Sequence, residues 1–188
     1  SEMCIRDRTK GLTLPLAAVG VGAAVASAKF GKGMSNIATL IPGNTQRVKE
    51  LGTGIRELGP VVGKSTSDLT DGMYQVVSAF GDSSDSMKIL DINARAATAG
   101  MATTEQAINL TSAVTKGYGD TSAAAVTKAS DLALMTVRLG QTTFPELAAS
   151  MGRVIPIAAN MGVTQEELHA TMATFTGVTG NAGEVSTQ

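Results

Sequence analysis

Cysteine, histidine and aromatic residues are scarce in this sequence of 188 residues. There is one cysteine, Cys4, one histidine, His169, and no tryptophan, and aromatic residues make up 3%. A single cysteine cannot close a disulfide within the chain or build a cysteine-based zinc site. With a single histidine, the chain lacks most of the side chains that a nucleophile–base pair or a metal site needs. We therefore predict no catalytic, cofactor-binding or metal-binding residues and no enzymatic activity.

Charge is also sparse, at 16% of residues against a typical ~25%. The net charge of −1 hides an asymmetry, because residues 1–64 hold nine Lys or Arg and four acids, whereas residues 65–188 hold six and twelve. Neither half is basic or aromatic enough for sequence-specific nucleic-acid binding. With few rings to fill a core, helices must pack closely through Ala, Gly, Val and Met. Such a lightly charged surface indicates self-association or a place in a larger assembly.

Glycine recurs at helix-length intervals. Gly81, Gly100, Gly119, Gly140, Gly162 and Gly180 are separated by 19, 19, 21, 22 and 18 residues. Glycine ends a helix because the left-handed conformation costs it nothing. Hydroxyl residues with Glu or Gln three positions later, the pattern of a capping box, follow three of these glycines, at Thr103–Gln106, Thr143–Glu146 and Thr164–Glu167.

Apolar residues at helical spacing, with no sustained alternation, predict an all-α fold. It consists of successive short amphipathic helices joined by Gly/Thr-rich turns and preceded by an apolar Ala/Gly-rich helix. We expect helices over Thr45–Leu58, Ser67–Phe80, Met87–Ala99, Glu105–Lys116, Ala123–Leu139, Phe144–Met161 and Gln165–Phe175. Gly59-Pro60 should interrupt the first of these. Pro156 should kink its helix or separate two shorter ones.

The composition divides the chain into four parts. Residues 1–8 resemble a translated cloning adapter and are set aside. An apolar helix over 9–33 and an amphipathic helix and turn over 34–64 follow. Residues 65–188 form a helical core, which we interpret as truncated at its C-terminal end.

The uncharged stretch Leu12–Ala28 has three interpretations. It is 17 residues long and is diluted by Pro15, Gly20 and Gly22, whereas a bilayer span needs about 20 strongly apolar residues. We favour a packed internal helix over a membrane-active or chaperone-covered helix. A signal peptide is the weakest interpretation, because no clean small-residue cleavage pattern follows.

Three other features resemble parts of a binding or catalytic site but lack the residues that such a site needs. Gly59–Ser65 resembles a phosphate-binding loop, but three residues rather than four separate its glycines and no strand precedes it. His169 is expected to be solvated or half-buried on a helix. Asp82 and Asp85 lie near a helix start, where capping and the helix dipole explain them.

The order of several weak motifs resembles the conserved core region of phage tail tape measure proteins. An apolar segment opens with Leu12–Leu16, and Phe30–Asn36 follows. A helix end at Leu58-Gly59 precedes a hydroxyl-rich start and a Met73-Tyr74 helix, and Ala158–Glu167 contains a Gly-Val-Thr-Gln-Glu-Glu turn. The resemblance runs from Thr9 to Gln188, as the N-terminal part of that core. Ala79-Phe80-Gly81 stands where the family usually has Ala-Gly.

The resemblance implies a structural virion component that acts in tail assembly and tail length determination inside the tail tube. It implies the tail tube protein, tail assembly chaperones and tail tip or baseplate proteins as partners, with host cytoplasm as the place of assembly. Leu12–Ala28 would be the segment for host membrane contact at infection. The alternative is a membrane-active helical pore or toxin-like protein that uses the same segment.

Overall fold

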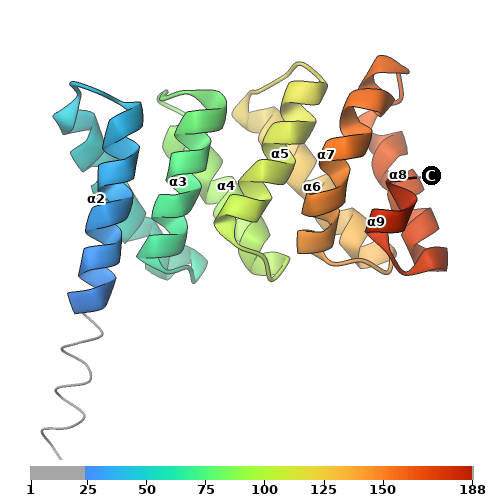
Figure 1. Ribbon diagram of the computed structural model, residues 1–188, viewed down its shortest axis with the longest axis horizontal. Helices are drawn as coiled ribbons and strands as arrows, with labels where there is room; N and C mark the ends of the chain where they lie inside the picture. Colours follow the sequence, from blue (N-terminus) through green and yellow to red (C-terminus); the bar gives the residue numbers. More distant parts are fainter. Residues whose placement is uncertain (1–23, 188) are drawn as a thin grey trace, which may run out of the picture.

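The computed structural model describes residues 24–187, and this part of the chain forms nine helices and no strand (Figure 1). The first helix covers residues 24–40. It is followed by α2 (Thr45–Val62), α3 (Thr66–Phe80), α4 (Ser86–Ala99), α5 (Thr104–Gly117), α6 (Ala123–Leu139), α7 (Phe144–Asn160), α8 (Gln165–Thr179) and α9 (Ala182–Val185). The all-α prediction is confirmed. Residues 1–8 and most of the apolar segment from Leu12 lie outside the described residues.

Local capping chemistry sets most of the helix starts. All three predicted capping boxes form: Thr103 with Gln106, Thr143 with Glu146 and Thr164 with Glu167. In each, the Thr hydroxyl accepts the third backbone N–H of the helix, and the Glu or Gln side chain accepts the N–H of the Thr. Two of the free donors at each helix start are therefore satisfied, which fixes where the helix begins.

The helices alternate between two layers. In Figure 1, α3, α5, α7 and α9 lie in front, and α4, α6 and α8 lie behind them. Each helix from α2 to α7 packs against the next but one, which is its neighbour in the same layer, and each except α7 also packs closely against the next in sequence. The molecule is therefore a row of helical hairpins, α2–α3, α4–α5, α6–α7 and α8–α9. Such a stack grows in one direction because each unit contacts only its neighbours.

Glycine makes the close contacts between neighbours within a layer. Gly33 on the first helix faces Thr70 of α3, Gly72 of α3 faces Thr104 of α5, and Gly117 of α5 faces Ile155 of α7. A Cβ at any of these glycines would collide with the facing side chain. The absence of a side chain at these points thus lets successive helices approach each other, as the aromatic-poor composition requires.

The core continues along the stack. One cluster of buried apolar residues extends from Phe30 and Ile37 to Val126 on α6, and a second extends from Ala96 on α4 to Ala182 on α9. The clusters interleave on α5, where Ile108 belongs to the first and Leu110 to the second. No break in packing therefore separates the two ends of the described chain.

Proline changes the structure less than expected. The prediction that Gly59-Pro60 interrupts its helix is wrong, because α2 continues to Val62 and ends at Gly63, whose φ is 69°. Pro60 lies in the last turn, where the break it makes in backbone hydrogen bonding is confined to the helix end. Pro156 lies within one continuous helix, α7, so two separate helices do not meet there. Helix α8 extends one turn past Phe175, to Thr179.

Candidate interaction surfaces

The one histidine is more deeply buried than the sequence suggests. His169 of α8 is 3% exposed, which corrects the expectation of a solvated or half-buried side chain. Its Nδ1 lies 2.8 Å from the carbonyl oxygen of Gln165, and its Nε2 has no hydrogen-bond partner among the described residues. Burial lowers the pKa of the imidazole, because the charged form would be poorly solvated there. Residues 24–187 contain no cluster of His, Cys, Asp and Glu that could hold a metal ion.

The segment that resembles a phosphate-binding loop has a structural role. Its first four residues lie in the last turn of α2. The Lys64 ammonium group donates to the carbonyl oxygen of Ala102 at 2.5 Å, and the Ser65 hydroxyl accepts the Asp68 N–H at 3.1 Å as the N-cap of α3. The lysine and the hydroxyl are therefore already used to join and start helices.

Asp82 does not cap a helix. The Arg47 guanidinium donates from Nε to both carboxylate oxygens of Asp82, at 3.1 Å each, and from Nη2 to the carbonyl oxygen of Ser83 at 2.6 Å. The hydrogen bond to Asp82 raises the pKa of Arg47. Asp85 occupies the N-cap position of α4 but makes no capping hydrogen bond with its side chain. Neither aspartate side chain therefore caps a helix through a hydrogen bond, contrary to the capping interpretation.

These polar contacts share one spacing. Arg47 and Asp82 are 35 residues apart, Lys64 and Ala102 are 38 apart, and the Thr98 hydroxyl donates to the carbonyl of Val62, 36 residues earlier, at 2.7 Å. Asp68 and Thr104 are also 36 residues apart. Three of these pairs join the α2–α3 hairpin to the α4–α5 hairpin, and Arg47 joins α2 to the connection before α4, so polar groups hold these two hairpins in register.

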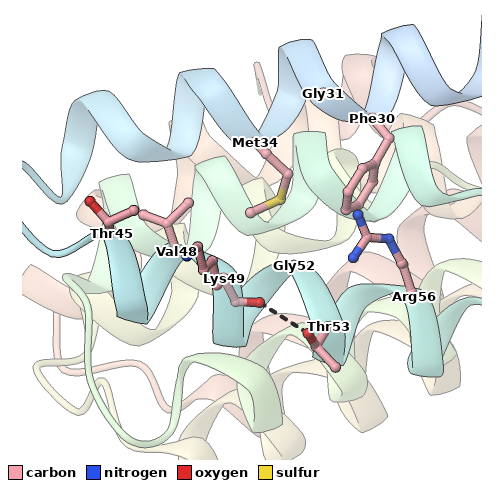
Figure 2. Close-up of a pocket in the computed structure, with 9 residues that line it drawn as sticks. All are labelled: Phe30, Gly31, Met34, Thr45, Val48, Lys49, Gly52, Thr53 and Arg56. Carbon is pink, nitrogen blue, oxygen red and sulfur yellow. Dashed lines mark hydrogen bonds between the residues drawn. The ribbon is translucent and has the colours of Figure 1, made fainter.

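A concave surface lies between the first helix and α2. Figure 2 shows this groove, of about 500 Å³, lined by Phe30, Gly31 and Met34 from the first helix and by Thr45, Val48, Lys49, Gly52, Thr53 and Arg56 from α2. The Arg56 guanidinium carbon lies 4.3 Å from the centre of the Phe30 ring. Gly54, on another face of α2, meets Met87 of α4. The groove therefore opens at the end of the stack, away from α4.

The groove is suited to binding rather than to catalysis. Its floor is apolar, with Met34 and Phe30 over Gly52, and its charged groups are the cations Lys49 and Arg56. It holds no carboxylate, histidine or cysteine that could transfer a proton or attack a substrate.

Comparison with known protein families identifies the family of this chain. A family model described as "Phage-related minor tail protein" matches residues 45–188, which is more than half of the chain. The chain belongs to this family. Neither the curated proteins nor the solved structures contain a match.

The family match in this minor tail protein begins later than the resemblance seen in the sequence. It starts at Thr45, the first residue of α2, so Leu12–Leu16 and Phe30–Asn36 lie outside it. Residues 24–28 end the apolar segment and lie exposed at the start of the first helix. None of the described helices is both long and apolar enough to cross a bilayer. Membrane contact through Leu12–Ala28 stays a prediction.

Sequence reasoning missed the contacts between hairpins. Arg47, Asp68 and Thr98 carried no motif, because each binds a partner 35 or 36 residues away along the chain. The signal that could have found them is the hairpin repeat, which places residues about 36 positions apart beside each other in the first two hairpins. The groove could not be recognised from a local sequence motif either, because its lining residues come from two helices, the first helix and α2, on either side of a turn.

Proposed function

We propose that this minor tail protein acts as the tape measure of a phage or prophage tail, lying inside the tail tube and determining its length during assembly. The family match over residues 45–188 supports a role in the tail. The same match supports a structural role.

The one-dimensional stack is the observation that supports length determination. A glycine facing a side chain recurs at each junction between hairpins: Gly72 against Thr104, Gly100 against Phe144, and Gly140 against Thr176. A hairpin can therefore be added without redesign of a central core. In such an architecture, physical length is proportional to the number of residues, which is the property that a molecular ruler needs.

The physical length depends on how the hairpins are arranged. Within the stack, one hairpin adds the spacing of packed helices, about 8–10 Å. The same stretch of roughly 38 residues, drawn out as one continuous helix, would span about 57 Å at 1.5 Å per residue. A change in tail length per deleted hairpin therefore reports both the ruler function and the arrangement of the chain in the tube.

The test is an in-frame deletion of residues 86–122 in the phage genome that encodes this chain. The deletion removes α4, α5 and the turn before α6, and it leaves Asp85 as the N-cap residue of α6. Electron microscopy should show tails that are uniformly shorter, and a duplication of the same residues should give uniformly longer tails. Gly152→Ala, a change at an open helix position, serves as the control with unchanged tails. Normally assembled tails of unaltered length in both the deletion and the duplication would rule out the ruler.

The partners of a tape measure follow from this proposal. They are the tail tube protein around it, assembly chaperones that cover apolar surface before the tube closes, and tail tip or baseplate proteins at one end. The groove at Phe30 and Met34 is one apolar surface that a chaperone would shield. Pull-down from cells that express the tail genes, with the wild-type chain and with Met34→Asp, tests this. Loss of a tail protein from the variant sample supports shielding at the groove, and identical samples contradict it.

A further inference from the structure

The stack ends at the first helix and α2 with an apolar face. A helix inside the stack packs on both sides within its layer, as α4 does against α2 and α6. Among the described helices, α2 has such a neighbour on one side alone, which is α4. Its other side carries the groove, which Phe30, Met34 and Val48 line. The terminal unit of a stacked architecture needs a polar outer face to stay soluble, so this end of the stack needs a cover.

The face of the first helix that lines the groove continues toward the start of the described chain. Ala24 and Ser27 precede Gly31 and Met34 at spacings of 3, 4 and 3 residues, which puts all four on one face of the helix. Ala24, Ser27 and Gly31 are exposed, and no described atom lies within 4 Å of a Cβ built at Gly31. Small, uncharged residues along this face thus leave room for a chain segment from the groove back to residue 24.

Charge restricts what can lie in the groove. The charged residues that line it are Lys49 and Arg56. The Arg56 guanidinium lies over the Phe30 ring, and Lys49 is exposed. Glu50, beside Lys49 in the sequence, does not line the groove, and its carboxylate lies 3.6 Å from the Arg47 guanidinium. An occupant must therefore be apolar and must bring no further cation to these two.

The sequence directly before the described chain has this composition. Leu12–Val19 reads Leu-Thr-Leu-Pro-Leu-Ala-Ala-Val and carries no charge. Ten residues, Gly20–Lys29, separate it from Phe30, so its effective concentration at the groove is of the order of millimolar. A second copy of the chain or another protein would have to bind from solution against this tethered competitor.

We propose that Leu12–Val19 folds back at Gly20–Gly22 and occupies the groove, where it covers this end of the stack. Glycine permits a sharp reversal of the chain because the left-handed conformation costs it nothing. The eight residues of Leu12–Val19 cover about 12 Å even as a helix, whereas the first helix rises about 10 Å from Ala24 to Gly31. The segment is therefore long enough to reach the groove.

This arrangement gives the apolar segment a packed position within its own chain. Its leucines would contact Phe30 and Met34, and its lack of charge avoids repulsion by Lys49 and Arg56. A chaperone that shields Met34 would have to displace the segment, so the two exclude each other at the groove. The proposal does not depend on the tape measure function, because it concerns the chain by itself.

The fluorescence of a single tryptophan tests this docking, because the sequence contains none. In the full chain, Leu14→Trp should emit at a shorter wavelength than the same variant in urea. Adding Gly31→Gln places a side chain in the groove and should move the emission toward that of the urea sample. Gly152→Gln, at an equally open position of α7, is the matched control and should leave the emission unchanged, with both variants folded by circular dichroism. Emission of Leu14→Trp that matches the urea sample, or that responds equally to the two glutamine substitutions or to neither, would overturn the proposal.

Cross-linking separates the chain's own segment from a second copy. In a Cys4→Ser background, Leu14→Cys and Thr53→Cys in one chain should form a disulfide on oxidation and run as a monomer on a non-reducing gel. The same Leu14→Cys with Thr171→Cys, at an exposed threonine of α8 at the other end of the stack, is the control and should form no such link. Disulfide-linked dimers of the Thr53→Cys variant would assign the groove to a second copy, and absence of any link would show that the segment does not dock there. Either result would overturn the proposal.

Discussion

Asp68 of α3 binds the start of α5 through Thr104. The Thr104 N–H lies 3.3 Å from both carboxylate oxygens of Asp68, and the Thr104 hydroxyl donates to the same carboxylate. Thr104 is fully buried, and Gly72, one turn after Asp68, packs against its methyl group. A carboxylate in the first turn of one helix thus also satisfies the first turn of the helix beside it, where the helix dipole favours negative charge.

The first prediction concerns this carboxylate. Asp68→Ala should lower the free energy of unfolding by about 2 kcal/mol, because a buried N–H and hydroxyl lose a charged acceptor. Urea denaturation followed by circular dichroism measures the change. Asp71→Ala, which removes an exposed aspartate on the same helix, is the matched control and should change stability by less than about 0.5 kcal/mol. Equal effects of the two substitutions would mean that the Thr104 contact adds nothing.

The second prediction separates two kinds of glycine. Gly100→Ala should destabilise the stack by about 1–3 kcal/mol, since its Cβ would lie 2.7 Å from Cβ and Cγ of Phe144, which is fully buried. Gly152→Ala, within α7 and with nothing described within 4 Å of an added Cβ, should stabilise by roughly 0.5–1 kcal/mol through helix propensity. Thermal melts of both variants give the comparison. If Gly100→Ala stabilised the protein, the space between Gly100 and Phe144 would be large enough for an added methyl group, contrary to this prediction.

The third prediction concerns a left-handed turn. Gly162 follows α7 with φ 77°, and nothing described lies within 4 Å of a Cβ built there. Gly162→Val should therefore cost about 1 kcal/mol or more for backbone reasons alone, because a β-branched residue resists this conformation. Gly162→Asn, which tolerates it, should cost distinctly less. Matching melting temperatures for the two variants would contradict a left-handed residue 162.

The fourth prediction is a pH dependence due to His169. Burial lowers the pKa of this imidazole in the folded protein, so between its folded and unfolded pKa values the unfolded chain binds more protons. Stability is then full above the unfolded pKa of about 6.5 and falls as the pH drops toward the folded value.

Urea denaturation between pH 7.5 and 5 should show this loss in the wild type and a flatter profile in His169→Gln. Because His169 is the one histidine of the sequence, its ring protons can also be titrated by NMR without overlap. Titration at or above pH 6.5 would contradict the burial argument.

Local signals in the sequence located the helices well. The capping boxes at Thr103, Thr143 and Thr164 form within four residues of chain, so their physics is visible in the sequence. Helix α6 begins and ends at the predicted residues, Ala123 and Leu139, between a serine cap and a glycine. Gly59-Pro60 misled because a proline in the last turn removes little hydrogen bonding, so α2 could continue to Gly63.

Contacts between hairpins could not be predicted in the same way. Six glycines end helices as expected, but Gly100 and Gly140 have φ of −91° and −100° and are needed for close packing rather than for a left-handed turn. Only the neighbouring helix distinguishes the two reasons. The pairing of Arg47 with Asp82 and the burial of His169 likewise depend on which helices meet. Nothing in the sequence around Arg47 of α2 indicates that its partner lies 35 positions away.

The packing of each hairpin against its neighbours alone has a mechanical consequence. Because each hairpin is held only by those beside it, tension on one end of the chain would detach hairpins in sequence order, and each release would lengthen the chain while the remainder stayed folded. Under pulling, such a molecule yields in steps of one hairpin instead of collapsing at once. It could be drawn through an opening narrower than itself and fold again on the far side from whichever hairpin emerges first.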